Sequence, residues 1–188
     1  MSEFTGKCVL VTGSSAGIGM GIAIMFARRG ANVSVCGRDD TRLQQVAETC
    51  RKAAQDAGHN VNVITVSGDI TTAEVRTKTL QQTLEVFGRL DVLVANHGLH
   101  APSADLASTT EEGFDLQFDT TVRSRLFLIK EAVLYLEKTN GCIITTSSVY
   151  STLAGKGQIA YHMSMAAVDH MVRCLALELG PKGEKPMI

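Results

Sequence analysis

Short runs of apolar, β-branched residues alternate along the chain with longer stretches in which apolar residues recur at helical spacing. The short runs predict strands near residues 7–12, 32–36, 61–66, 91–95 and 141–147. The longer stretches predict helices near residues 17–29, 40–57, 72–87, 111–138 and 158–179. Strands that alternate with helices in this way are typical of an α/β fold with a parallel sheet, here as a single domain over residues 1–188.

Residues at the helix ends support this division. Two helix starts have the spacing of a capping box, Thr71 with Glu74 and Thr109 with Glu112, in which each side chain pairs with a backbone N–H. Glycines follow the first three helices, at Gly30, Gly58 and Gly88.

Composition narrows the function classes. The 188 residues are 45% apolar and 20% charged with a formal net charge of -1, which gives no basic field for nucleic acid. The five cysteines are odd in number and show no zinc spacing, so we expect reduced thiols and no metal site. We expect a cytoplasmic protein without a membrane span, because no apolar run approaches spanning length and the amino terminus lacks an apolar signal core.

The stretch Thr12–Gly19 is a glycine-rich turn between the first strand and the first helix. A helix that begins there points unpaired N–H groups and the positive end of its dipole at any bound anion. Glycine also lets a pyrophosphate approach the backbone closely. With the second strand, the turn completes a βαβ unit and predicts a Rossmann-like doubly wound sheet. Its candidate cofactor residues are Gly13, Ser15, Gly17, Ile18 and Gly19.

Arg38 follows the second strand, where dinucleotide folds distinguish a ribose hydroxyl from a 2′-phosphate. A carboxylate at the end of this strand would favour NAD, whereas Gly37 stands there and the guanidinium of Arg38 suits a phosphate. The sequence therefore favours NADP over NAD. The alternative is that Arg38 is only a solvated residue before a helix.

Two further turns follow predicted strands at the same edge of the sheet. Asp69 and Ile70 come after the third strand, where Asp69 can accept a hydrogen bond from adenine and can also cap the next helix, since the two roles are compatible. Asn96 and Gly98 come after the fourth strand and combine an amide side chain with a glycine that allows close approach of a ligand. We expect all four residues to contact the cofactor.

Ser148 ends the fifth strand, and Tyr161 follows it by 13 residues at the start of a helix. With the glycine turn, the Asp69 turn and the Asn96 turn in this order, the chain resembles the short-chain dehydrogenases/reductases from about Phe4 to Gly183. The resemblance implies hydride transfer between a nicotinamide and a small alcohol or carbonyl substrate. It assigns Ser148 to the substrate oxygen and Tyr161 to its proton.

The chain departs from the family at two site positions. A free tyrosine has a pKa of about 10 and needs nearby positive charge to act as a base near neutrality. The family supplies a lysine four residues after the tyrosine, where this chain has Met165, and an asparagine where this chain has Thr121. His162, which neighbours Tyr161, is a weak candidate for the missing charge, because adjacent helical residues point in different directions.

The carboxyl end departs as well, because only Glu184–Ile188 follow where the family continues into two more strands and a substrate loop. Five residues with a central proline do not form a buried strand, so we expect a shortened product. Three hypotheses stay open: an NADP-dependent oxidoreductase with turnover in question, an inactive nucleotide- or partner-binding protein, or a chain that does not fold stably alone and pairs with a full-length relative. In the family the helices near 111–138 and 158–179 pack between subunits, which implies a homo-oligomer.

Overall fold

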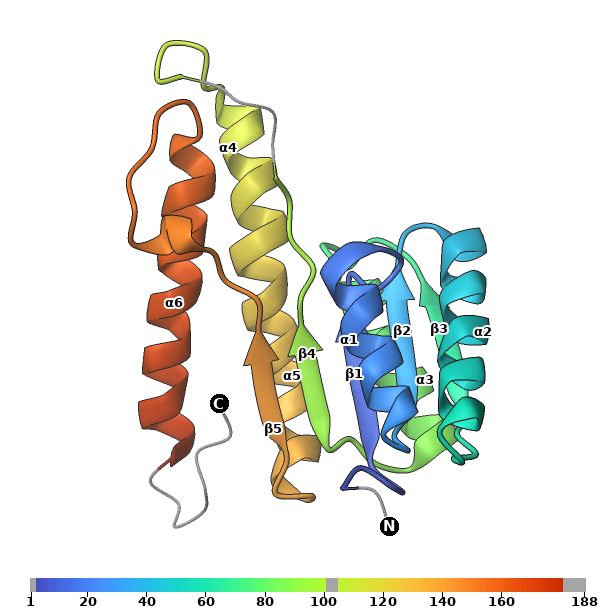
Figure 1. Ribbon diagram of the computed structural model, residues 1–188. Helices are drawn as coiled ribbons and strands as arrows, with labels where there is room; N and C mark the ends of the chain where they lie inside the picture. Colours follow the sequence, from blue (N-terminus) through green and yellow to red (C-terminus); the bar gives the residue numbers. More distant parts are fainter. Residues whose placement is uncertain (1–2, 101–104, 181–188) are drawn as a thin grey trace.

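In the computed structural model, which describes residues 3–100 and 105–180, five parallel strands form one sheet in the order β3-β2-β1-β4-β5 (Figure 1). The strands are β1 (Cys8–Thr12), β2 (Asn32–Gly37), β3 (Val63–Ser67), β4 (Val92–Ala95) and β5 (Cys142–Thr145). The helices are α1 (Gly17–Arg28), α2 (Asp40–Asp56), α3 (Ala73–Phe87), α4 (Glu111–Phe118), α5 (Ser124–Glu137) and α6 (Ile159–Leu179). The predicted doubly wound parallel sheet is therefore confirmed, and its strand order reverses between β1 and β4.

Helices cover both faces of this sheet. Apolar side chains of α1 and α2, such as Phe26 and Leu43, pack with Val9 and Val11 on one face. On the other face Leu10 packs with side chains of α3 and α5, and three residues of α6 join this cluster, namely Met171, Leu175 and Leu179. Every residue of β1 and β4 is buried, which is why these strands appear in the sequence as continuous apolar runs.

Two details of this region differ from the sequence prediction, and a third prediction is not tested. The predicted helix 111–138 is two helices, because a π-helical turn, Asp119–Arg123, separates α4 from α5. A 3-10 helix, Val149–Ser151, follows β5 and was not predicted. The expected departure at Glu184–Ile188 lies outside the described residues.

The predicted capping boxes were wrong by one residue. Thr72 caps α3 by accepting the N–H of Val75, and Thr110 caps α4 by accepting the N–H of Gly113. Neither Val75 nor Gly113 can return a side-chain hydrogen bond, so these are simple caps.

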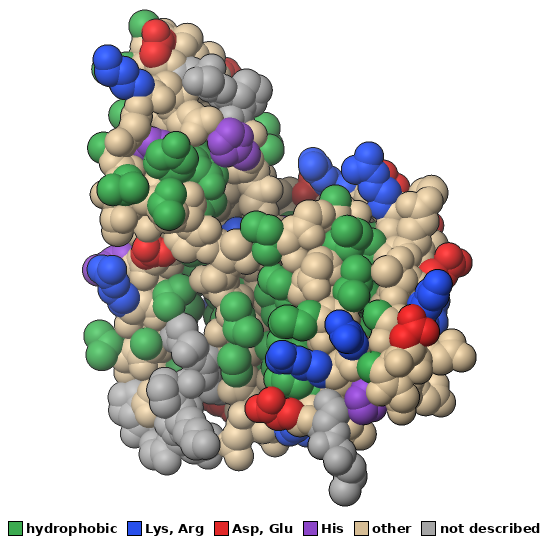
Figure 2. Space-filling model, viewed as in Figure 1, with side chains coloured by type: hydrophobic (Ala, Val, Ile, Leu, Met, Phe, Trp, Pro, Cys, Tyr) green, Lys and Arg blue, Asp and Glu red, His purple; other side chains and the backbone are tan. Residues whose placement is uncertain are grey.

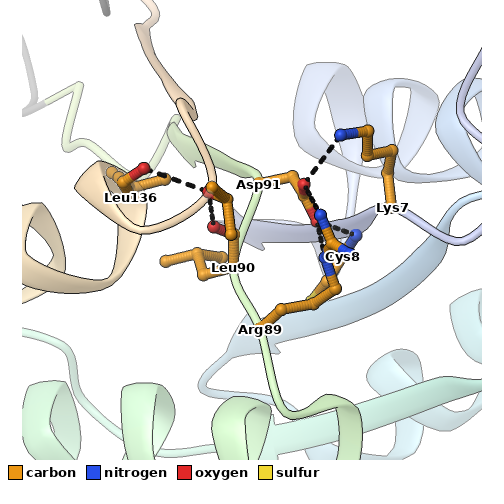
Figure 3. Close-up of polar contacts among 7 residues, drawn as sticks. Lys7, Cys8, Arg89, Leu90, Asp91 and Leu136 are labelled. Carbon is orange, nitrogen blue, oxygen red and sulfur yellow. Dashed lines mark hydrogen bonds and ion pairs between the residues drawn. The ribbon is translucent and has the colours of Figure 1, made fainter.

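The buried carboxylate of Asp91 connects residues at the amino ends of the strands (Figure 3). Asp91, just before β4, accepts hydrogen bonds from the N–H of Cys8 at 2.9 Å, from Lys7 Nζ at 3.1 Å and from two nitrogens of Arg89 at 2.7 and 2.6 Å. Its backbone oxygen accepts the N–H of Cys142, so one residue connects the starts of β1, β4 and β5.

Two features are absent from residues 3–100 and 105–180. No helix in these ranges is long and apolar enough to cross a membrane. No group of three or more His, Cys, Asp or Glu side chains there is placed to hold a metal ion.

Candidate active site

The glycine turn packs against the turn that follows β4. Gly13 has a φ of +63°, and a Cβ on it would stand 2.7 Å from the Cα of His97. A Cβ on Gly19 would collide with the carbonyl oxygen of Gly13 and would lie 2.5 Å from the amide nitrogen of Asn96. Only glycine fits at positions 13 and 19, so these two residues set how closely the ends of β1 and β4 approach.

Gly17 has a different role, because the space around it is open. Its φ is +57°, and a Cβ there would have no atom within 4 Å. The helix α1 begins at this residue, its N-cap Ala16 makes no side-chain hydrogen bond, and its first turn holds no acidic residue. The first-turn amides at Gly17, Ile18 and Gly19 thus form an open, uncapped helix terminus, which fits the pyrophosphate of a dinucleotide.

A cavity of about 290 Å³ opens at the carboxyl end of the sheet. Figure 2 shows the surface stepping down between the tall part that holds α4 and α6 and the lower part that holds α1 and α2. The cavity is lined by Gly13, Ser15, Ala16, Cys36, Gly37, Arg38, Gly68, Asp69, Ile70, Thr71, Asn96, His97, Gly98, Leu116 and Thr120. It gathers most of the predicted cofactor residues, while Gly17, Ile18 and Gly19 lie outside its lining in the first turn of α1.

Asp69 faces this cavity and does not cap α3. Its Oδ1 accepts the backbone N–H of Thr71 at 3.0 Å and the Thr71 hydroxyl at 2.8 Å. The hydrogen bond from the Thr71 N–H is the main cause that lowers the pKa of Asp69, and the positive charge of Arg38 contributes further. Arg38 itself is exposed at the cavity, and no ion pair to it occurs within the described ranges.

Asn96 links three strand ends. Its amide nitrogen donates to the carbonyl oxygens of Thr12 and Gly13, each at 3.2 Å, and its amide oxygen accepts the hydroxyl of Thr146 at 2.9 Å. The residues that follow β1, β4 and β5 are thereby held together. This side chain therefore fixes the floor of the cavity.

His97, which the sequence did not single out as a site residue, is buried beneath this turn. Its Nδ1 lies 2.6 Å from the hydroxyl oxygen of Thr12, and its Nε2 lies 2.8 Å from that of Ser124. Ser124 donates its own proton to the carbonyl oxygen of Thr120, so it accepts from Nε2. Burial, and then the positive charge of Arg125, lowers the pKa of His97 to about 3, so the imidazole is neutral.

The sequence did not identify Arg125 as a site residue either. Its guanidinium lies under the same turn after β4. Nε donates to the carbonyl oxygen of His97 at 2.7 Å, one terminal nitrogen donates to Thr146 at 2.7 Å and the other to Asn96 at 3.4 Å. The residue is 1% exposed. A charged side chain is therefore enclosed between β4, β5 and α5.

Ser148 and Tyr161 are not part of the lining of this cavity. Ser148 begins the 3-10 helix, where its hydroxyl accepts the N–H of Tyr150 at 3.3 Å. Tyr161 lies in the first turn of α6, half-buried, with its ring 4.9 Å from that of His100 and 6.3 Å from that of Tyr150. A second, more open hollow of about 630 Å³ adjoins this pair and is lined largely by residues 150–157, Ile159, His162 and Met163.

The two departures from the family are both buried. Met165 is 5% exposed in α6, one turn after Tyr161. Thr121, in the π-helical turn, accepts the N–H of Leu99 at 3.3 Å and the amide N–H of Gln117 at 2.9 Å. Gln117, another residue that the sequence did not reveal, also donates to Ser164, while its amide oxygen has no partner among the described residues.

Comparison with known proteins agrees with this geometry. The sequence profile of the short chain dehydrogenase family matches residues 7–185. The chain is 33% identical to hydroxynaphthalene reductase arp2 of Aspergillus fumigatus over 95% of its own length and 63% of that protein. It is 35% identical to versicolorin reductase 1 of Dothistroma septosporum, over 94% of this chain and 65% of the relative. The chain thus spans somewhat less than two thirds of both relatives.

A solved structure of the same family also matches this chain. A short-chain dehydrogenase/reductase of unknown function from Caenorhabditis elegans, crystallised with its cofactor, superposes with a TM-score of 0.84 at 30% identity. The match covers 94% of this chain and 66% of the other. The strand order, the glycine turn and the profile match agree: this chain belongs to the short-chain dehydrogenase family.

Proposed function

We propose that the chain is an NADP-dependent oxidoreductase that interconverts an alcohol and a carbonyl compound, with Ser148 and Tyr161 as its polar pair. The observation that carries this proposal is the cavity at the switch point of the sheet, which joins the glycine turn to the exposed Arg38. Ligands of open α/β sheets bind at this point. The family's named dehydrogenases and reductases support the reaction class.

Different residues at the cavity would bind different parts of the cofactor. The first turn of α1 would hold the pyrophosphate, Arg38 the 2′-phosphate, and Asp69 with Ile70 the adenine side of the cavity. A bound nicotinamide would supply the two-electron chemistry at the substrate carbon. Ser148 would donate a hydrogen bond to the substrate oxygen. The phenolate of Tyr161 would take the hydroxyl proton in oxidation, and the phenol would give it back in reduction.

Cofactor choice is tested by titrating the purified chain with NADPH and NADH and following cofactor fluorescence. We expect tighter binding of NADPH. Arg38→Ala should weaken NADPH binding by about tenfold or more, because a charge-assisted contact is lost, and should leave NADH binding unchanged. Arg42→Ala is the matched control, since Arg42 is an exposed arginine that pairs with Asp39. Equal binding of both cofactors by the parent would contradict the choice of NADP.

Activity is tested with NADPH and a panel of ketones and aldehydes. Turnover that falls by about 10²-fold or more in Tyr161→Phe supports the assigned role, since general acid–base catalysis contributes about that much. A folded chain that binds NADPH and turns over none of the panel favours the second candidate, an inactive nucleotide- or partner-binding protein. Met165 and Thr121 motivate that candidate, because neither carries the charge or the amide that the family places there.

A further inference from the structure

The first turn of α3 contains a buried cation. Arg76 is the fourth residue of this helix, and it is 8% exposed. A positive charge near the amino end of a helix faces the positive end of the helix dipole, and removing that charge from water adds a desolvation cost. An arginine therefore opposes the stability of α3 at this position, unless its contacts offset the cost.

The guanidinium of Arg76 contacts the turn between β3 and α3. Its Nη1 donates to the carbonyl oxygen of Ile70 at 3.2 Å and to that of Thr71 at 2.7 Å. Ile70 and Thr71 both line the cavity at the carboxyl end of the sheet, next to Asp69. Hydrogen bonds from a charged donor are roughly twice as strong as those from a neutral one. Arg76 thus holds two successive peptide groups of the cavity wall.

One of these peptide groups also holds the carboxylate of Asp69. The peptide group that follows Ile70 carries the N–H of Thr71, and this N–H donates to Asp69 Oδ1 at 3.0 Å. The Thr71 hydroxyl donates to the same oxygen at 2.8 Å. Because a peptide group is planar, a contact that fixes its carbonyl oxygen also fixes the direction of its N–H. The orientation of the Asp69 carboxylate therefore depends on Arg76.

Arg76 is held in turn by α5. Its guanidinium carbon lies over the ring of Phe127, 5.7 Å from the ring centre, and its Nε lies 3.8 Å from Glu131 Oε1. The other carboxylate oxygen of Glu131 accepts the hydroxyl of Thr77 at 3.1 Å. An aromatic ring and a carboxylate both attract the cation and limit its movement. A continuous series of contacts thus runs from α5 through Arg76 to Asp69.

We propose that Arg76 is a positioning residue for adenine, because it orients the turn 69–72 so that Asp69 can accept a hydrogen bond from the adenine amine. This role rests on the proposed function, which places adenine beside Asp69 and Ile70. Arg76 is not part of the cavity lining, so it acts on the cofactor through the peptide group between Ile70 and Thr71.

The test compares NADPH with deamino-NADPH, in which a carbonyl oxygen replaces the adenine amine and cannot donate to a carboxylate. Both are titrated into the purified chain by nicotinamide fluorescence. We expect the parent to bind NADPH about tenfold or more tightly than the analogue, because a charge-assisted hydrogen bond is lost. Arg76→Met should reduce this ratio of dissociation constants to below about threefold. Arg76→Lys should retain part of it, since an ammonium can still donate to carbonyl oxygens.

Thr83→Val is the matched control on the same helix. Thr83 lies two turns after Arg76 and is buried, and its hydroxyl oxygen lies 2.8 Å from that of Ser34. This variant should weaken the packing of α3 and keep the parent ratio, because a general loss of packing weakens both dinucleotides alike. If Arg76→Met does not fold, Arg76→Gln replaces it, and the ratio should fall by at least about threefold. The proposal is overturned if the Arg76 variant keeps the parent ratio, or if Thr83→Val loses it as well.

Hydrogen exchange tests the hold on the turn without any ligand. We expect the backbone amide of Thr71 to exchange about tenfold faster or more in Arg76→Met than in the parent, and at the parent rate in Thr83→Val. An unchanged rate in Arg76→Met would contradict the role of Arg76 in this turn. Absent NADPH binding by the parent would instead contradict the proposed function, and the adenine role with it.

Discussion

Two buried charges lie at opposite ends of β4, and they have different kinds of hydrogen-bond partner. Asp91, just before the strand, is 4% exposed and receives hydrogen bonds from Lys7, Arg89 and the N–H of Cys8 (Figure 3). Arg125 lies under the turn after the strand, is 1% exposed, and donates hydrogen bonds to carbonyl oxygens. Asp91 is thus compensated by cations, whereas no ion pair to Arg125 occurs within residues 3–100 and 105–180.

The difference separates a buried charge that joins strands from one that lies beneath the edge of the sheet where the cavity opens. A buried ion with full partners joins parts of the fold, as Asp91 joins three strands. A buried ion without a counter-charge is costly, and such groups gather where a charge forms during a reaction. The compensated charge lies at the amino edge of the sheet, whereas the uncompensated one lies at the carboxyl edge, where ligands bind.

The largest effect should come from Asp91→Asn. We expect the free energy of unfolding to fall by about 3 kcal/mol, the lower end for a broken buried ion pair, because Lys7 and Arg89 can still turn to water. Urea unfolding at pH 7 measures this loss. A loss below about 1 kcal/mol would place Asp91 among ordinary surface charges.

The pH dependence of stability tests whether the charge of the Asp91 carboxylate causes this loss. Burial opposes the charge of Asp91, but the hydrogen bonds from Arg89, Cys8 and Lys7 outweigh it and lower the pKa of the carboxyl. The unfolded chain then binds this proton at higher pH than the folded chain does. The stabilisation is complete above the ordinary pKa near 4 and is lost as the pH falls through the folded value. Parent and variant should therefore converge in stability below pH 4.

His97→Gln should give the next largest effect, at the other end of β4. Burial keeps the imidazole neutral, with its pKa lowered to about 3, so the unfolded chain alone binds a proton between about pH 6.5 and that value. Stability is complete above pH 6.5 and should fall by about 2 to 3 kcal/mol by pH 4.5. The variant should lack this slope. An unchanged slope in unfolding titrations would mean that another group causes it.

Thr12→Val should have a smaller effect on the same cluster. It removes the hydroxyl that lies 2.6 Å from His97 Nδ1 and leaves a buried ring nitrogen without a partner. We expect a loss of about 1 to 3 kcal/mol in the free energy of unfolding at pH 7. Thr65→Val is the control, since that hydroxyl bonds Gln44 at an exposed site, and it should change stability by less than about 0.5 kcal/mol.

The smallest effect should come from Lys7→Met, at the compensated end. The lysine side chain is 43% exposed, and its contact with Asp91 is only one of several. Exposed ion pairs contribute about 0 to 1 kcal/mol, and urea unfolding should show a loss in that range. A loss above 2 kcal/mol would show that Arg89 and the Cys8 N–H do not compensate Asp91 without it.

Much of the fold could be predicted because its signals are local. The buried strands are short apolar runs, and Gly30, Gly58 and Gly88 follow the helices with positive φ angles where the chain reverses. The π-helical turn 119–123 could not be predicted, because its residues, Asp-Thr-Thr-Val-Arg, include no glycine or proline that would mark a break in the predicted helix 111–138. It differs from an α-helix only in backbone hydrogen bonding, which the residue types there do not dictate.

The candidate site was partly predictable for a topological reason. Parallel strands end at one edge, so residues that follow them, such as Arg38, Asp69 and Asn96, gather in one cavity. Arg125 was missed because a charged residue in an amphipathic helix is usually solvated. One signal could have found it: Arg125 lies four residues after Thr121, so the two share a helix face.

The amide of Asn96 has a consequence for motion. Because it bonds the backbone of Thr12 and Gly13 and the hydroxyl of Thr146, the ends of β1, β4 and β5 cannot separate one at a time. Backbone amides in these three segments should open to solvent hydrogen exchange together, as one cooperative unit. The floor of the cavity should then move as one rigid unit, and opening of the cavity should occur in the loops around it.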